Sequence, residues 1–138
     1  IQLNKSKLSG ISGQSINSFA VPFGVYNDTV ISTVATYHTN LRDTSGALNY
    51  KYNFNPFKIH AKVVTANTTT NEINNLIQET KNNNAWLVLV FHNISKQNSN
   101  DEYTLTTKTL TNFLNLVTKS GIKVMTNKEA LSTITSQL

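Results

Sequence analysis

The residue whose side-chain chemistry points most clearly to a function is a histidine that ends a long apolar run. Residues 86–92, WLVLVFH, contain no Gly, Pro or formal charge and are β-branched at alternate positions. This pattern predicts a strand buried on both faces, as in a parallel sheet covered by helices. Functional groups collect where such strands end, and His92 there could transfer a proton or bind a metal. Alternatively, His92 could do no more than cap the end of the strand with a hydrogen bond.

A second candidate is the turn Pro22-Phe23-Gly24, which follows a short predicted strand at residues 18–21. Proline cannot donate to a sheet ladder, so it ends that strand, and Gly24 is free to adopt a positive φ. Judged by spacing alone, these three residues could be nothing more than a turn. Asn27 or Asp28 then caps a helix that we expect to run to about Tyr37.

The remaining elements alternate between strands and helices. After a helix tail and loop at 1–17, we expect further strands at 38–42, 58–64 and 122–125. Capping boxes, Thr69 with Glu72 and Thr126 with Glu129, open two helices, and an amphipathic helix covers 105–120. This alternation predicts one α/β domain over residues 1–138, with a parallel sheet or barrel.

Residues 44–57 form a long connection without a consistent period, and long connections are often binding loops or lids. The aromatic residues Tyr50, Tyr52 and Phe54 could form a platform for a sugar. A loop folded over its own aromatic side chains explains them nearly as well.

Composition narrows the classes of partner. The 138 residues include no cysteine, which rules out disulfides and thiolate metal sites. The net charge of +5 comes from lysines scattered singly, so we expect no nucleic-acid partner, although an anionic polymer or cell surface would be attracted. No apolar run approaches the roughly 20 residues that span a bilayer.

Two stretches in register resemble the C-terminal half of a NodB-type polysaccharide deacetylase domain. They are FAVPFGVYND at residues 19–28 and WLVLVFHNI at residues 86–94. Residues 55–60 and 122–131 fit the same order and spacing, so the resemblance covers the chain from about Ile16 to Leu131.

The resemblance implies parallel β/α units that form part of an incomplete barrel and remove N-acetyl groups from a polysaccharide or oligosaccharide. It also implies a secreted or cell-envelope location in bacteria. In that family a divalent metal such as zinc polarises the amide carbonyl and activates water, while a general acid protonates the leaving amine.

Carried onto this sequence, His92 would be the general acid and the Phe23 backbone N–H an oxyanion donor. The substrate-binding residues would be Pro22, Phe23, Tyr26, Trp86 and Val90, with Val90 in the pocket for the acetyl methyl group. Tyr26 and Trp86 could instead be packing aromatics, an interpretation that we favour for Trp86.

The departures from the family pattern concern the metal and the base. The Asp-Asp pair and the His-x-x-x-His motif that bind the metal do not occur, and His38, His60 and His92 lack metal-ligand spacing. We assign no metal ligand here and interpret His38 and His60 as strand-edge histidines without function. Ala20 stands where many members have an arginine, and Asn93 replaces a common aspartate.

We therefore expect the metal to be bound by an N-terminal half that these residues do not include, and this segment alone to be inactive. Half a barrel exposes sheet edges and an apolar face. The expected cover is that N-terminal half, supplied by another chain or segment, or self-association. The alternative function is a non-catalytic carbohydrate-binding or interaction module on the same scaffold.

Overall fold

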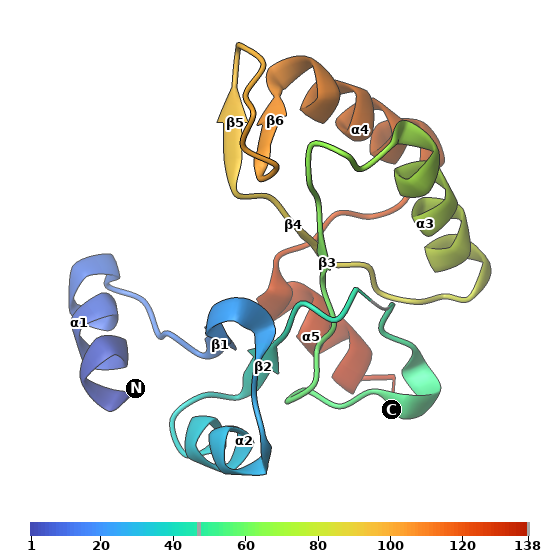
Figure 1. Ribbon diagram of the computed structural model, residues 1–138. Helices are drawn as coiled ribbons and strands as arrows, with labels where there is room; N and C mark the ends of the chain where they lie inside the picture. Colours follow the sequence, from blue (N-terminus) through green and yellow to red (C-terminus); the bar gives the residue numbers. More distant parts are fainter. Residues whose placement is uncertain (47, 138) are drawn as a thin grey trace.

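The computed structural model describes residues 1–46 and 48–137 as a mixed α/β chain (Figure 1). The helices are α1 Gln2–Ser12, α2 Asp28–Ala35, α3 Thr70–Asn82, α4 Thr107–Ser120 and α5 Asn127–Thr135. The strands are β1 Ser18–Ala20, β2 Asn40–Arg42, β3 Lys62–Val63, β4 Leu89–Val90, β5 Asn93–Ser95 and β6 Thr104–Thr106. Two 3-10 turns are η1 Pro22–Gly24 and η2 Lys51–Asn53.

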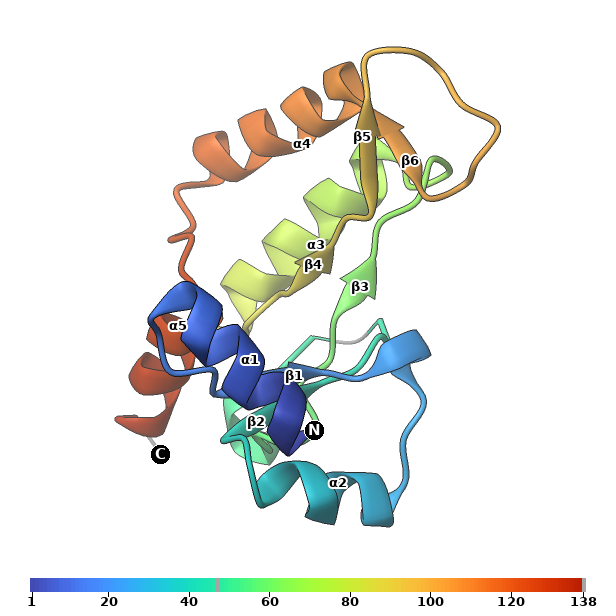
Figure 2. The same ribbon diagram turned by 90° about the vertical axis from the view of Figure 1, so that its left-hand side faces the viewer.

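The strands pair in parallel, as the alternation of elements predicted. Strand β1 pairs with β2 in the register Ser18 to Asn40, and β3 pairs with β4 in the register Lys62 to Leu89. A parallel bridge from Arg42 to Ile59 links β2 to the residues before β3. The parallel α/β class is thus confirmed, while in the described part of the chain these strands close no barrel (Figure 2).

The capping residues in the sequence correctly predict where three of the helices begin. The Asn27 side chain accepts a hydrogen bond from the Val30 N–H at 3.0 Å and caps α2. Both predicted capping boxes form, at Thr69 with Glu72 and at Thr126 with Glu129. Each box satisfies two backbone N–H groups that the first helical turn leaves without a partner. Helix α2 ends at Ala35, two residues before the predicted end.

In the part of the chain that the structure describes, two clusters of buried side chains form most of the core. One lies between α3, α4, β6 and the residue after β3, and comprises Val64, Ile73, Ile77, Leu105 and Phe113. The other lies between β1, β2 and α2, and comprises Val21, Val34 and Leu41. Helices α3 and α4 lie side by side over the first cluster (Figure 1).

The prediction of a strand buried on both faces at residues 86–92 is wrong. Only Leu89–Val90 has strand geometry, residues 85–91 are half-buried, and His92 is exposed. Strand β4 pairs with β3 alone, so its opposite edge has no neighbour among the described residues. Burial of an apolar run depends on elements that cover it, and here one side is uncovered.

Two further expectations need correction near the C-terminus. Residues 122–125 are not a strand, because no described strand lies beside them to accept a ladder of hydrogen bonds. Helix α4 begins at Thr107 with Thr106 as its cap, and Leu105 belongs to β6 instead. The parallel pair β5 and β6, which flanks the polar loop at residues 96–103, was not predicted.

Helix α1 stands apart from both clusters, and none of its side chains is buried (Figure 1). Its Lys5 ammonium donates to the Tyr37 carbonyl and ties the helix to the residues after α2. No helix in the described part of the chain is long and apolar enough to cross a bilayer.

Two neighbouring positions of α4 give a first prediction. Phe113 is 1% exposed, whereas its neighbour Leu114 is 55% exposed. Truncating Phe113 to Ala should lower the free energy of unfolding by about 3–5 kcal/mol, since it leaves a cavity in the cluster. Leu114→Ala, the matched control, should cost less than about 1 kcal/mol in urea unfolding. Equal losses for the two variants would contradict this placement of α4.

Candidate functional site

The turn η1 at the end of β1 holds an unusual backbone conformation. The Gly24 N–H closes the turn onto the Val21 carbonyl at 3.1 Å. Phe23 has φ 57° and Gly24 has φ 70°, so both lie in the left-handed region. For a non-glycine residue this region costs roughly 1–2 kcal/mol, and such strain gathers at functional sites. The Phe23 side chain is 97% exposed, and its N–H does not take part in the bond that closes the turn.

Gly24 also allows the turn to press against the residue that follows Asp43. A Cβ atom on Gly24 would lie 2.0 Å from Thr44 Oγ1 and 3.1 Å from the Thr44 backbone nitrogen. The contact with Oγ1 could be relieved by turning the Thr44 side chain, but the contact with the backbone nitrogen could not. The turn after β1 is therefore seated on the residues that follow β2.

A buried carboxylate lies at the centre of this region. Asp43 is 2% exposed and accepts hydrogen bonds from the Tyr26 hydroxyl at 3.0 Å and from the Ser45 N–H at 3.0 Å. His60 Nδ1 lies 3.0 Å from Asp43 Oδ2 and 2.6 Å from Ser45 Oγ. We call these four residues, Tyr26, Asp43, Ser45 and His60, the Asp43 network. It joins three segments that are separated in the sequence.

The contacts of the network set its protonation. Burial alone would raise the pKa of Asp43, but the bonds from Ser45 N–H and Tyr26 and the nearby His60 together hold that pKa below its usual value. Burial, and then the bond to the Asp43 carboxylate, raise the pKa of Tyr26. Tyr26 therefore keeps its proton as a donor while Asp43 remains an anion.

The network is not a serine–histidine–aspartate relay. In such a triad the carboxylate and the hydroxyl bind opposite nitrogens of the imidazole ring. Here Ser45 Oγ and Asp43 both contact Nδ1 of His60. Asp43 thus orients the ring, and the His60 side chain, 33% exposed, leaves Nε2 outside these contacts.

The residues present do not fit a metal centre. Across residues 1–46 and 48–137, no three His, Asp or Glu side chains come together as potential ligands. Asp43 and His60 supply two such groups at most, and they bind each other. We therefore derive no metal-dependent step from this chain.

His92, the predicted general acid, lies between β4 and β5 and is exposed. Its ring packs at a tilt of 58° against Tyr103, with centroids 5.0 Å apart. The adjacent Asn93 N–H donates to the Tyr103 carbonyl at 3.1 Å. The exposed His92 ring makes no hydrogen bond to another described residue.

The other predicted site residues do not form one group. Pro22, Phe23 and Tyr26 lie in or just after η1, where Tyr26 reaches Asp43. Val90 lies in β4 opposite Val63 and is half-buried. Trp86 lies at the other end of the 86–92 segment from His92, with its ring 6.3 Å from that of Phe54.

Sequence reasoning missed the Asp43 network and assigned His60 no role. Asp43 follows the predicted strand at 38–42, and a carboxylate at the end of a parallel strand is a recognisable signal. His38, by contrast, is 7% exposed and packs on Phe19 with ring centroids 5.3 Å apart. Burial, with smaller effects from Lys5 and the N-terminus, lowers the pKa of His38 and keeps it neutral.

An apolar groove lies between residues 84–91 and the residues of α4, α5 and the connection between these helices. Its volume is about 490 Å³, within the range of ligand and segment binding sites. The lining includes Leu87, Leu89, Phe91, Val117, Ile122 and Val124. Among the described residues that line it, the charged ones are Lys51 and Lys123, and no carboxylate takes part.

Comparison with known proteins identifies no relative, since no protein family, curated protein or solved structure matches this chain.

The buried carboxylate gives a pH-dependent prediction. Because the folded-state pKa of Asp43 is lowered, its stabilisation is present above the unfolded pKa and is lost as the pH falls through the folded-state value. Asp43→Asn should therefore cost about 1–3 kcal/mol of unfolding free energy at neutral pH, and this deficit should shrink below about pH 4.

Asp28→Asn is the control, because Asp28 is exposed in the first turn of α2 and should contribute less than about 1 kcal/mol. Urea unfolding of the three proteins at several pH values measures both effects. A deficit for Asp43→Asn that does not change with pH would contradict the anionic role.

Proposed function

We propose that this chain is the C-terminal part of a metal-dependent polysaccharide deacetylase, which hydrolyses N-acetyl groups of an N-acetylated sugar polymer. The observation that carries the proposal is the strained turn η1. Its Phe23 N–H lies outside the turn's own hydrogen bond, at the end of a parallel strand and beside a buried anionic network. A preorganised backbone donor of this kind suits an oxyanion that forms during amide hydrolysis.

In this proposal the residues of this chain bind the substrate and protonate the leaving amine, but they do not activate the attacking water. Phe23 N–H donates to the oxyanion, and Pro22 and Tyr26 contact the reacting sugar. Trp86, which lies away from η1, contacts a more distant sugar of the same polymer. Val90 contacts the acetyl methyl group. His92 donates a proton to the leaving amine, a role that its accessible ring permits. The Asp43 network acts indirectly, since it fixes η1 through Tyr26 and Thr44.

The divalent metal, zinc or a similar ion, belongs in this proposal to a segment outside these 138 residues, as does the catalytic base. The uncovered edge of β4 and the apolar groove beside it support the need for such a segment. An N-terminal half of the domain, or a second copy of the chain, would bury both. The polymeric substrate places the complete protein at the bacterial cell envelope or outside the cell.

One group of side chains favours a second candidate, a non-catalytic carbohydrate-binding or interaction module. Two aromatic pairs, Tyr50 with Tyr52 and Phe54 with Trp86, lie on or beside the 48–57 loop, away from η1 (Figure 1). Aromatic rings of this kind can bind sugars without any catalytic residue. Upstream sequence separates the candidates, since metal ligands before Ile1 favour the enzyme and their absence favours binding.

The first test uses the 138 residues alone. The chain should release no acetate from N-acetylglucosamine oligomers with zinc or cobalt added, because metal ligands and base lie elsewhere. Acetate release above the metal-only background, measured by a coupled enzymatic assay, would contradict the division of the site.

The second test concerns His92 in the domain reconstituted with its metal-bearing segment. His92→Ala should lower the rate of acetate release by about 10²–10⁴-fold, the usual contribution of a general acid. Lys96→Ala, an exposed change four residues away, is the control and should leave the rate unchanged. Activity close to that of the unaltered domain would remove the acid role from His92.

A further inference from the structure

Two tyrosines in the 48–57 loop form a stacked pair on the surface. The rings of Tyr50 and Tyr52 lie 5.4 Å apart between centroids with an angle of 22° between their planes. Tyr52 is 83% exposed. Since Tyr50 covers one face of the Tyr52 ring, the opposite face is available to a partner.

Contacts with three other elements hold this pair in place. The Tyr50 hydroxyl donates to Glu79 Oε1 on α3 at 2.9 Å. Asn49 exchanges backbone hydrogen bonds with Trp86 at 2.8 and 3.0 Å, and its side chain accepts from the His60 N–H at 2.8 Å. The ring of Phe54 packs against Trp86. The loop is therefore ordered before any ligand binds, which lowers the entropic cost of binding.

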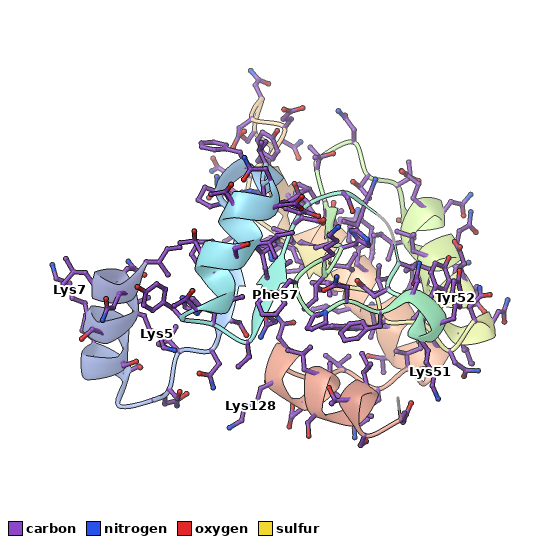
Figure 3. All side chains as sticks on the ribbon, turned by 90° about the horizontal axis from the view of Figure 1, so that it is seen from below. Lys5, Lys7, Lys51, Tyr52, Phe57 and Lys128 are labelled. Atoms are coloured by element: carbon purple, nitrogen blue, oxygen red, sulfur yellow. The ribbon has the colours of Figure 1, made fainter. Side chains whose placement is uncertain are left out.

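Lys51 lies between the two tyrosines in η2, with an exposed side chain. Figure 3 shows Lys51 and Tyr52 close together at one end of the molecule, with Lys5 and Lys7 at the other end. Lys51 and the lysines of α1 thus do not lie together as a track for a phosphate backbone. The Glu79 carboxylate behind Tyr50 would also repel phosphates. A neutral ligand with a flat apolar face and many hydroxyls fits this surface better.

We propose that Tyr50, Lys51 and Tyr52 form a glycan-binding platform that is separate from η1 and His92. A pyranose ring would stack its C–H face on Tyr52, whose ring face carries partial negative charge. The Lys51 ammonium would donate to hydroxyl or carbonyl oxygens of the same or the next sugar. The choice of an N-acetylated glycan rests on the proposed deacetylase function.

The position of the platform gives it a distinct role. In Figure 1 the teal turn η2 lies well away from the blue turn η1. A sugar on Tyr52 is therefore not the sugar that reacts. The platform anchors a long chain by a remote residue, so it favours polymers over short oligomers.

The test is an NMR titration of the 138-residue chain with a hexamer of N-acetylglucosamine. We expect shifts of the backbone amides of residues 49–54 at hexamer concentrations below about 10 mM, which corresponds to weak single-site binding. Tyr52→Ala should weaken binding about tenfold or more, as the loss of one stacking ring does elsewhere. Tyr52→Phe should bind within about twofold of the unaltered chain, because stacking uses the ring and not the hydroxyl.

Lys51→Gln should weaken binding severalfold, and Glu79→Ala should do the same by releasing Tyr50. Tyr103→Ala is the matched control, an exposed tyrosine beside His92, and should not change hexamer binding. Three results would overturn the platform: no shift of residues 49–54, equal binding by Tyr52→Ala, or tighter binding of an oligothymidylate than of the hexamer.

The platform and the deacetylase proposal fail in different ways. Hexamer binding at residues 49–54 without any acetate release by the reconstituted domain would contradict the enzyme and keep the platform. Acetate release that is the same for hexamer and dimer and insensitive to Tyr52→Ala would keep the enzyme and remove the platform.

Discussion

The burial of one carboxylate is the constraint on which the described site depends. Asp43 is removed from water, and such a group is tolerated only where donors replace its hydration. Tyr26, Ser45 and His60 supply those donors from three segments. The loop after β2 is thereby fixed, and η1 is in turn seated on it through Gly24 and Thr44.

This arrangement explains how a left-handed Phe23 persists. A strained backbone residue relaxes unless its surroundings determine its position on several sides. The turn is held before Phe23 by β1, after it by Tyr26, and beneath it by Thr44. An exposed aromatic side chain, and a backbone N–H that the turn's own hydrogen bond does not use, are the consequence.

Features encoded by neighbouring residues could be predicted from the sequence. The capping boxes and the turn at Pro22 depend on side chains within four positions of the backbone groups they serve, so their spacing identifies them. The parallel α/β class followed from the alternation of elements. The Asp43 network could not be predicted in the same way, because Asp43 and His60 are brought together only by the pairing of β2 with the residues before β3.

The errors in the strand predictions have a common cause. Residues 86–92 and 122–125 are apolar enough to form strands, but a strand also needs a neighbour for its backbone groups. Among the described residues, strand β4 has a neighbouring strand on one side only, and residues 122–125 line the apolar groove. The pattern of side chains shows that these segments can be buried. It does not show whether a neighbouring strand is present to pair with them.

The uncovered groove is also the feature that ties the fold to the proposed function. An apolar edge without charge or proline is normally covered in a native protein. The segment that would cover β4 and the groove is, in our proposal, the one that binds the metal. Docking of that segment would then complete the fold and the active site together.

Native mass spectrometry of the protein purified from its source, with metal content measured on the same sample, tests this claim most directly. We predict that these 138 residues occur with a second segment of similar size, on the same chain or bound to it, and with one divalent metal per copy. A metal-free species of 15.3 kDa, or simple multiples of it, would contradict the account.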